Sequence, residues 1–250
     1  SVYPFGIVDC SPDPSILTAH VYYEGQSKKG GNNVASMLWK DAALKGLIDI
    51  TPAAEIMYVF DNCGGQNKNK MVLRWLVFMA QIKCALVLEA SFLVKGHTKN
   101  DCDRMFNLVK YDYRKTNVYT PGDLLECLNC HSQVRAFMMD PEEFQDWDKF
   151  EDRFMIKQIA GCSANHVFTI YADNPHLMVI REYHGGPVVQ KKFVVKKEFR
   201  NKTRTWWLTQ VQSYLEPCVE PGMPDIKWCE LYFKWGKYVP QEKKEEFRYY

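Results

Sequence analysis

The part of the sequence best suited to chemistry is an acid that directly follows an apolar run. Asp61 comes after Tyr58-Val59-Phe60, and the glycine pair Gly64-Gly65 follows it. A carboxylate at the tip of a buried strand is held rigidly, as a metal ligand of a nucleic-acid enzyme must be, and adjacent glycines let backbone approach a phosphate closely. The nearby side chains that can donate hydrogen bonds to phosphates or bases are Asn62, Gln66, Asn67, Lys68 and Asn69. The structural alternatives are an Asx turn at Asp61 and a capped helix entry after it.

A second acidic motif, Gly96-His97-Thr98-Lys99-Asn100-Asp101-Cys102-Asp103, is expected at another strand-to-helix junction. Thr98 and Asp101 have the spacing of a capping box, so Asp101 is expected to start the helix. Asp103 lies further into the first turns, where the helix dipole favours a carboxylate, and is the better candidate ligand. His97 could orient a scissile phosphate or assist a metal, or it could be a hydrogen-bonded turn residue.

Two carboxylates from separate elements are typical of metal-assisted phosphoryl transfer, in which divalent ions activate the nucleophile and stabilise the leaving oxygen. We therefore expect Asp61 and Asp103 to bind Mg²⁺ or Mn²⁺, with His97 as a further catalytic residue. A different chemistry, that of a cysteine- or metal-dependent hydrolase, would use Cys63 or Cys102 with His97. Under that alternative Cys63→Ala would abolish activity, whereas the metal hypothesis tolerates it.

The elements that must position these residues alternate between strands and helices. The expected strands are Val2–Val8, Leu17–Glu24, Glu55–Phe60 and Leu86–Val94. The expected helices are a segment capped by Asn32 or Asn33, then Lys70–Lys83, then Asn100–Arg114. The strand ending at Phe60 is apolar enough to be expected buried on both faces. This order predicts an α/β fold, with a mixed sheet flanked by helices.

The order of elements and acids is similar to that of the ribonuclease H-like fold, which supplies acids from its first strand, its fourth strand and a later helix. Asp61 matches the fourth-strand acid and Asp103 matches the helix acid. Such a core has three strands before its first helix, whereas this sequence has two. The first strand and its acid are therefore expected upstream of Ser1, and the lack of an initiator Met agrees. The alternative takes Val2–Val8 as the first strand and Asp9 as its acid.

Several segments resemble a eukaryotic family of transposon-related proteins whose activity is not established. These segments are Lys29–Ser36, Asp61–Asn69, Gly96–Asp103, Ile226-Lys227-Trp228, Val239-Pro240 and Phe247–Tyr250. The resemblance covers most of the chain. It implies that the chain is related to DDE-type transposases, which have a ribonuclease H-like core. It implies a nucleic-acid-processing domain with metal-dependent DNA cleavage or strand transfer by ancestry. The alternative is a domesticated, catalytically inactive module that binds DNA or a protein.

The sequence changes character after Thr120-Pro121. A short helix is expected from Pro121, and strand-like runs follow at His166–Ala172, Leu177–Tyr183, Val188–Phe199 and Thr205–Val211. We therefore expect a ribonuclease H-like core in residues 1–119 and a smaller antiparallel β and helical region in residues 120–250. Within the second region, a basic segment before Trp206-Trp207 suits a nucleic-acid groove, or else guards an edge strand. Its candidate contacts are Lys192, Lys196, Lys197 and Arg200.

Composition limits the partners and the compartment. The formal net charge is only +2, so DNA binding has to come from local patches. The nine cysteines are odd in number and scattered, which favours reduced thiols and an intracellular location. The expected DNA partner indicates a nuclear location. The longest apolar stretch, Met71–Ala90, is interrupted by Arg74, Gln81, Lys83 and Glu89, so no membrane partner is expected.

Overall fold

The computed structural model describes residues 1–49, 51–94 and 100–245, and the contacts divide the chain into two compact units. The first unit comprises residues 1–28, 99–144 and 218–250, and the second comprises residues 29–98 and 145–217. The boundary expected between residues 119 and 120 falls inside the first unit, between two helices that pack together. Each unit contains its own sheet and its own helices, so the mixed α/β fold class is confirmed.

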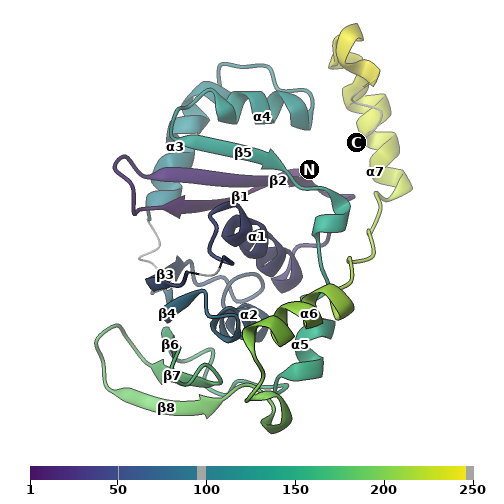
Figure 1. The fold of residues 1–250 in the computed structure, drawn as a ribbon. Coiled ribbons are helices and arrows are strands. Elements are labelled where there is room, and N and C mark those ends of the chain that lie inside the picture. The colour runs from purple at the N-terminus through teal and green to yellow at the C-terminus, as the bar shows by residue number, and fades with distance from the viewer. Residues whose placement is uncertain (50, 95–99, 246–250) are drawn as a thin grey trace. The chain divides into compact units, whose positions relative to one another are not determined.

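The first unit is built on a three-stranded sheet with β2 at its centre (Figure 1). The strands in spatial order are β1 (Val2–Asp9), β2 (Ile16–Tyr23) and β5 (Val134–Met138). β1 is antiparallel to β2, and β5 is parallel to it. The helices are α3 (Asp101–Tyr113), α4 (Pro121–Asn129) and α7 (Asp225–Cys229), with short helical turns after α7.

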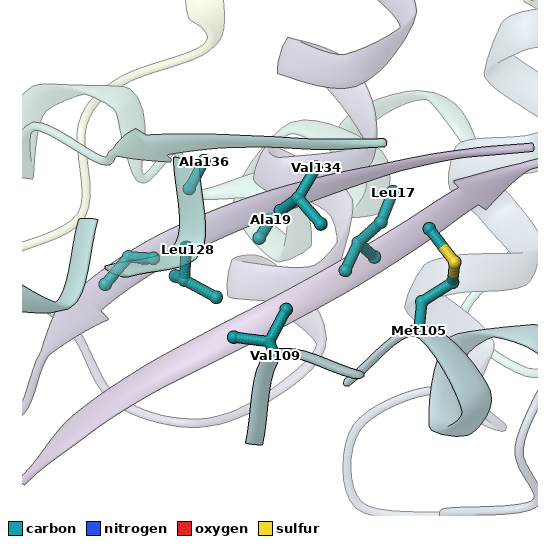
Figure 2. Packing of buried hydrophobic residues seen from close by; sticks show 8 residues of the cluster. Leu17, Ala19, Met105, Val109, Leu128, Val134 and Ala136 are labelled. Carbon is teal, nitrogen blue, oxygen red and sulfur yellow. The ribbon is translucent and has the colours of Figure 1, made fainter. Parts of the chain in front are cut away.

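The core of the first unit lies between its sheet and helices α3 and α4. Figure 2 shows side chains from β2, β5, α3 and α4 pointing toward one another. Leu17 and Ala19 are two residues apart on β2, so they share one face of the sheet, whereas Met105 and Val109 are four apart on α3 and share one side of the helix. The side chains on these two faces pack together in one apolar layer, to which Leu128, Val134 and Ala136 also belong.

The second unit is built on a five-stranded sheet. The strands in spatial order are β3 (Ala53–Phe60), β4 (Ala85–Phe92), β6 (Val167–Tyr171), β7 (Leu177–Arg181) and β8 (Val188–Phe193). β3 and β4 are parallel, and the other neighbours are antiparallel. The helices are α1 (Gly31–Leu44), α2 (Lys70–Gln81), α5 (Trp147–Phe154) and α6 (Arg204–Tyr214).

Helix α2 is the central helix of the second unit. It is buried on almost all sides and contacts β4, β6, α1 and α5. Aromatic rings fill the space around it: Phe78 of α2 lies 5.6 Å from both Trp147 and Phe150 of α5, between ring centroids. On the sheet side, the ring of Tyr58 packs edge-on against Trp75 at 5.8 Å. These contacts fix α2, and with it the loop that joins β3 to α2.

Three local expectations are wrong. β3 is an edge strand with Met57 and Val59 exposed, not a strand buried on both faces. Helix α1 begins at Gly31 after an N-cap at Gly30, so neither asparagine expected to cap it does so. The run expected as a strand at 205–211 is part of α6, because the Thr203 side chain accepts a hydrogen bond from the Trp206 N–H (3.1 Å) and caps a helix. No helix among the described residues is long and apolar enough to cross a membrane.

Candidate functional site

Asp61 lies immediately after the carboxyl end of β3, beside the end of the parallel strand β4. Phe60 and Phe92 are in register, and the Leu93 N–H donates to the Phe60 carbonyl at 2.9 Å. The two strands therefore end together. Ligands of α/β sheets bind outside the carboxyl ends of parallel strands. The position of Asp61 is thus one at which an α/β protein can present a functional carboxylate.

The Asp61 carboxylate is exposed but held through one of its oxygens. Its Oδ1 accepts the Cys63 N–H at 3.3 Å and a short hydrogen bond from the Asn67 side-chain amide. The Asx turn considered as the structural alternative is therefore present. Its Oδ2 has no hydrogen-bond partner among the described residues. The turn fixes the direction of the carboxylate and leaves this oxygen for a ligand.

Two residues of the amide-rich segment have structural roles. Asn69 is the N-cap of α2, and its side chain accepts the N–H groups of Met71 (2.9 Å) and Val72 (3.1 Å). Lys68 is buried, and its ammonium group donates to the Ser163 carbonyl at 3.1 Å. Burial lowers the pKa of Lys68. These two side chains tie the loop to the helix and to the chain before β6.

The glycine pair of this loop, unlike Lys68 and Asn69, has no structural role in the fold. Gly64 and Gly65 are exposed, and a Cβ built at either position would meet no atom within 4 Å. Neither has a positive φ. Nothing in the fold therefore requires glycine at these two positions, and the loop offers bare backbone to solvent between Asp61 and the partly exposed side chain of Gln66.

In the first unit, Asp103 has the capping role that was expected of Asp101. Asn100 is the N-cap of α3, its side chain accepts the Asp103 N–H at 3.0 Å, and Asp103 accepts the Asn100 N–H at 3.3 Å. α3 does begin at Asp101, as expected, and Thr98, the other residue of the expected cap, lies outside the described residues. Asp101 instead forms an ion pair with Arg104 at 2.9 Å.

Asp9, the alternative first acid, also lies in the first unit, at the end of β1. Its carboxylate accepts hydrogen bonds from the N–H (2.9 Å) and hydroxyl (2.7 Å) of Ser11, as expected of a turn residue. The neighbouring Cys10 thiol donates to Asp101 at 3.5 Å. Burial raises the pKa of Cys10, and the charges of Asp101 and Asp9 raise it further.

The two expected metal ligands belong to different units, Asp61 to the second and Asp103 to the first. His97, the third expected catalytic residue, lies outside the described residues. Among residues 1–49, 51–94 and 100–245, no group of three or more His, Cys, Asp or Glu side chains could hold a metal ion. Each unit by itself therefore contributes one expected acid, in a different local setting.

The cysteines of the alternative hydrolase are likewise divided, with Cys63 in the second unit and Cys102 in the first. The Cys102 thiol donates to the Gly6 carbonyl at 3.2 Å, which places it in the packing between α3 and β1. All nine cysteines of the chain are described, and none forms a disulfide.

The four basic candidates have unequal roles in the second unit. The Lys196 ammonium group donates to the carbonyls of Asp152 and Arg153, both at 2.8 Å, and so caps the end of α5. Arg200 donates to the Val195 carbonyl at 3.0 Å and stacks on the Phe193 ring at 4.0 Å. Lys197 is exposed, whereas Lys192 of β8 is half-buried.

Sequence reasoning missed a polar cluster on one face of the five-stranded sheet. Glu89 of β4 is buried, its Oε2 accepts the Thr169 hydroxyl at 2.9 Å, and its Oε1 lies 3.1 Å from Nδ1 of His184. The Arg181 guanidinium donates to the same Thr169 hydroxyl at 2.9 Å. The one available signal was a glutamate inside the apolar run Leu86–Ala90, since a buried carboxylate requires partners.

The sequence model of one protein family matches residues 22–185, more than half of the chain. The chain belongs to that family, which is described as a domain of unknown function, DUF7869. The matched span contains the Asp61 loop and all four residues of the polar cluster, and it ends before β8. A search of curated proteins and a search of solved structures gave no match.

Proposed function

We propose that this chain is a nucleic-acid-processing domain of transposase ancestry with a ribonuclease H-like core, and that Asp61 is one of its metal-binding carboxylates. The observation that carries the proposal is the exposed Asp61 carboxylate at the end of β3, with one oxygen fixed by the Asx turn and the other without a hydrogen-bond partner among the described residues. The resemblance of the Asp61–Asn69 segment to transposon-related proteins supplies the reaction class.

The residues fit a divalent ion only in part. Mg²⁺ takes one or two protein carboxylates and completes its shell with water and substrate phosphate oxygens, so the single free oxygen of Asp61 suits it. When bound, Mg²⁺ or Mn²⁺ would stabilise negative charge on the scissile phosphate and its leaving oxygen. Asp103, the other expected ligand, belongs to the first unit and stays a candidate on its own. Its exposed carboxylate uses Oδ2 in the capping box and has no hydrogen-bond partner for Oδ1 among the described residues.

The Gly64-Gly65 backbone supports a phosphate-bearing partner. Neither steric contacts nor backbone conformation requires glycine at these two positions. The close approach of a ligand to the backbone would explain why glycine occurs there. Exposed backbone N–H groups beside a metal-binding carboxylate can hold a phosphate in place. DNA is the partner that the transposon resemblance implies, and a nuclear location follows from DNA as the partner.

The test is cleavage of supercoiled plasmid DNA in Mg²⁺ and in Mn²⁺. Asp61→Asn keeps an oxygen for the Asx turn but removes the charge, so cleavage should fall by at least about a hundredfold while thermal stability stays unchanged. Asp173→Asn is the matched control, because Asp173 is an exposed acid elsewhere in the same unit. Cleavage by the wild type that Asp61→Asn leaves intact would remove Asp61 from the mechanism.

A second candidate is a catalytically inactive module that binds nucleic acid on the same fold. It is favoured by the structural use of Asp103, whose carboxylate takes part in the capping box of α3. This candidate predicts DNA binding without cleavage in either metal. Mn²⁺ titration by calorimetry separates the two, since a metal-binding Asp61 gives heat of binding that Asp61→Asn lacks.

A further inference from the structure

We propose that the sheet face formed by β6, β7 and β8 on the side of Lys191 binds a single strand of nucleic acid. This inference rests on the proposed function for its class of partner, but it assigns a second surface that does not involve Asp61. Strand register defines the face, because residues paired across neighbouring strands point to the same side. One row of this face runs through Glu89, Thr169, Val179 and Lys191.

The opposite face of the same sheet faces the core. Its neighbouring row runs through Leu88, Ile170, Met178 and Lys192. The first three of these are buried. Glu89, Thr169 and Val179 of the Lys191 row are buried as well, so within that row only Lys191, on β8, is exposed, whereas Lys192 is half-buried. Lys191 and Lys192 are adjacent in sequence but point to opposite faces, and of the two only Lys191 is exposed.

The Lys191 face combines exposed aromatic rings with cationic groups. Phe193 is 44% exposed and lies two residues from Lys191 on β8, about 7 Å along the strand. Tyr171, at the end of β6, is 37% exposed on the same side. The Arg200 guanidinium stacks over the Phe193 ring at 4.0 Å. Exposed rings beside cations, as here along the margin of the sheet, are typical of surfaces on which unpaired bases stack.

The polar cluster fixes the other end of this face. Arg181 is held by the Thr169 hydroxyl and His184 by the buried carboxylate of Glu89, and both Glu89 oxygens have a partner within the cluster. The His184 side chain is 68% exposed, and because Nδ1 is taken by Glu89, its Nε2 is the nitrogen left for a ligand. Arg181, His184 and Lys191 therefore line the path of a polyanion.

A single strand fits this surface better than a duplex. The aromatic side chains can stack only on unpaired bases, and a flat sheet face does not enter a groove. The acid Glu55, on β3, pairs with Val87 and so shares this face at its far side. The ligand should consequently follow the β7 and β8 half of the sheet.

The experiment is fluorescence anisotropy with labelled oligothymidylate and oligouridylate of about 12 nucleotides, a length within the site sizes of such surfaces. Lys191→Glu should weaken binding about tenfold and reduce the salt dependence, whereas Lys192→Glu, with the same change in net charge, should alter affinity less than twofold. Phe193→Ala should weaken binding about tenfold without changing the salt dependence. The two oligonucleotides show whether DNA or RNA is preferred.

Equal losses from Lys191→Glu and Lys192→Glu would overturn the proposal, because only overall charge would then matter. Tighter binding of a duplex of the same length, or a Lys191-dependent dimer in place of oligonucleotide binding, would also overturn it. The outcome is distinct from that for Asp61. If the wild type cleaves DNA and Lys191→Glu binds oligonucleotides as tightly as the wild type, the proposed function stands and the proposal for this surface is refuted. If the wild type binds no nucleic acid at all, both proposals are refuted.

Discussion

Glu151 provides the sharpest test of the packing in the second unit. It lies in α5, its side chain is fully buried, and neither carboxylate oxygen has a hydrogen-bond partner among the described residues. Arg74 is also buried, but its guanidinium donates to Asp152 at 2.8 Å and to the Ile156 carbonyl. Burial therefore raises the pKa of Glu151 well above its ordinary value of 4.5, and the nearby Arg74 charge only partly opposes this.

The sign of the pH dependence follows from this raised pKa. Below pH 4.5 the carboxyl group is protonated in both the folded and the unfolded chain, so it costs the fold little. Above that value the unfolded chain releases the proton and the folded chain retains it. Each further pH unit then lowers the free energy of unfolding by about 1.4 kcal/mol, until the pKa of the folded state is reached.

Glu151→Gln removes this penalty while keeping the shape of the side chain. The variant should match the wild type within about 0.5 kcal/mol at pH 4, and should become more stable than it by about 1–3 kcal/mol at neutral pH. Urea unfolding followed by Trp fluorescence across this range measures the difference, and Glu198→Gln is the control because Glu198 is exposed. A variant that is less stable than the wild type at neutral pH would refute the reasoning, since Glu151 would then be an ionised partner of Arg74.

Substitutions at three further positions test the loop after Asp61. Asn69→Ala should lower the free energy of unfolding by about 1 kcal/mol in urea denaturation, because α2 loses its cap, while Asn69→Asp should restore it. Lys68→Ala should cost about 1–2 kcal/mol by the same measurement, yet leave oligonucleotide affinity unchanged, because the ammonium group is bound to Ser163; a selective loss of affinity would contradict the tether. Gly65→Ala should leave the melting temperature unchanged or slightly raised but weaken DNA binding in gel-shift titrations, and unaltered binding would show that no ligand approaches this backbone.

The sequence predicted best those elements whose pattern is local. The apolar runs and the asparagine before Lys70 placed α2, and the strands around it, within a few residues of the observed ends. The segment after Thr203 failed because Trp206, Trp207 and Val211 fit a helix as well as a short strand, and the cap at Thr203 decides between them. The exposure of β3 was not predictable from its own residues, because it depends on where the strand lies in the sheet.

The candidate site was predictable only as a set of residue types. The sequence selected the loop after β3, but it could not separate the residues that hold the loop, Lys68 and Asn69, from the carboxylate that faces solvent. The cluster around Glu89 was out of reach, because His184 lies 95 residues away from its partner. No local spacing reports a contact of that kind. The register of β4 and β6 pairs Glu89 with Thr169, and the segment after β7 brings His184 to the same carboxylate.

The catalytic and the inactive hypotheses both accommodate the Asp61 loop as observed. They differ in which other residues the function requires. An Asx turn orients the carboxylate in either case, so its presence does not argue against a metal. The hypotheses differ in the side chains that they require. A nuclease needs further carboxylates that bind the same metal ion, whereas a binding module needs basic and aromatic side chains over a wider surface. The second unit supplies the latter by itself, in Lys191, Phe193 and Arg181, and supplies Asp61 as its one expected metal ligand. Nucleic-acid binding should therefore persist in variants that lose every expected metal ligand, whereas cleavage should depend on Asp61.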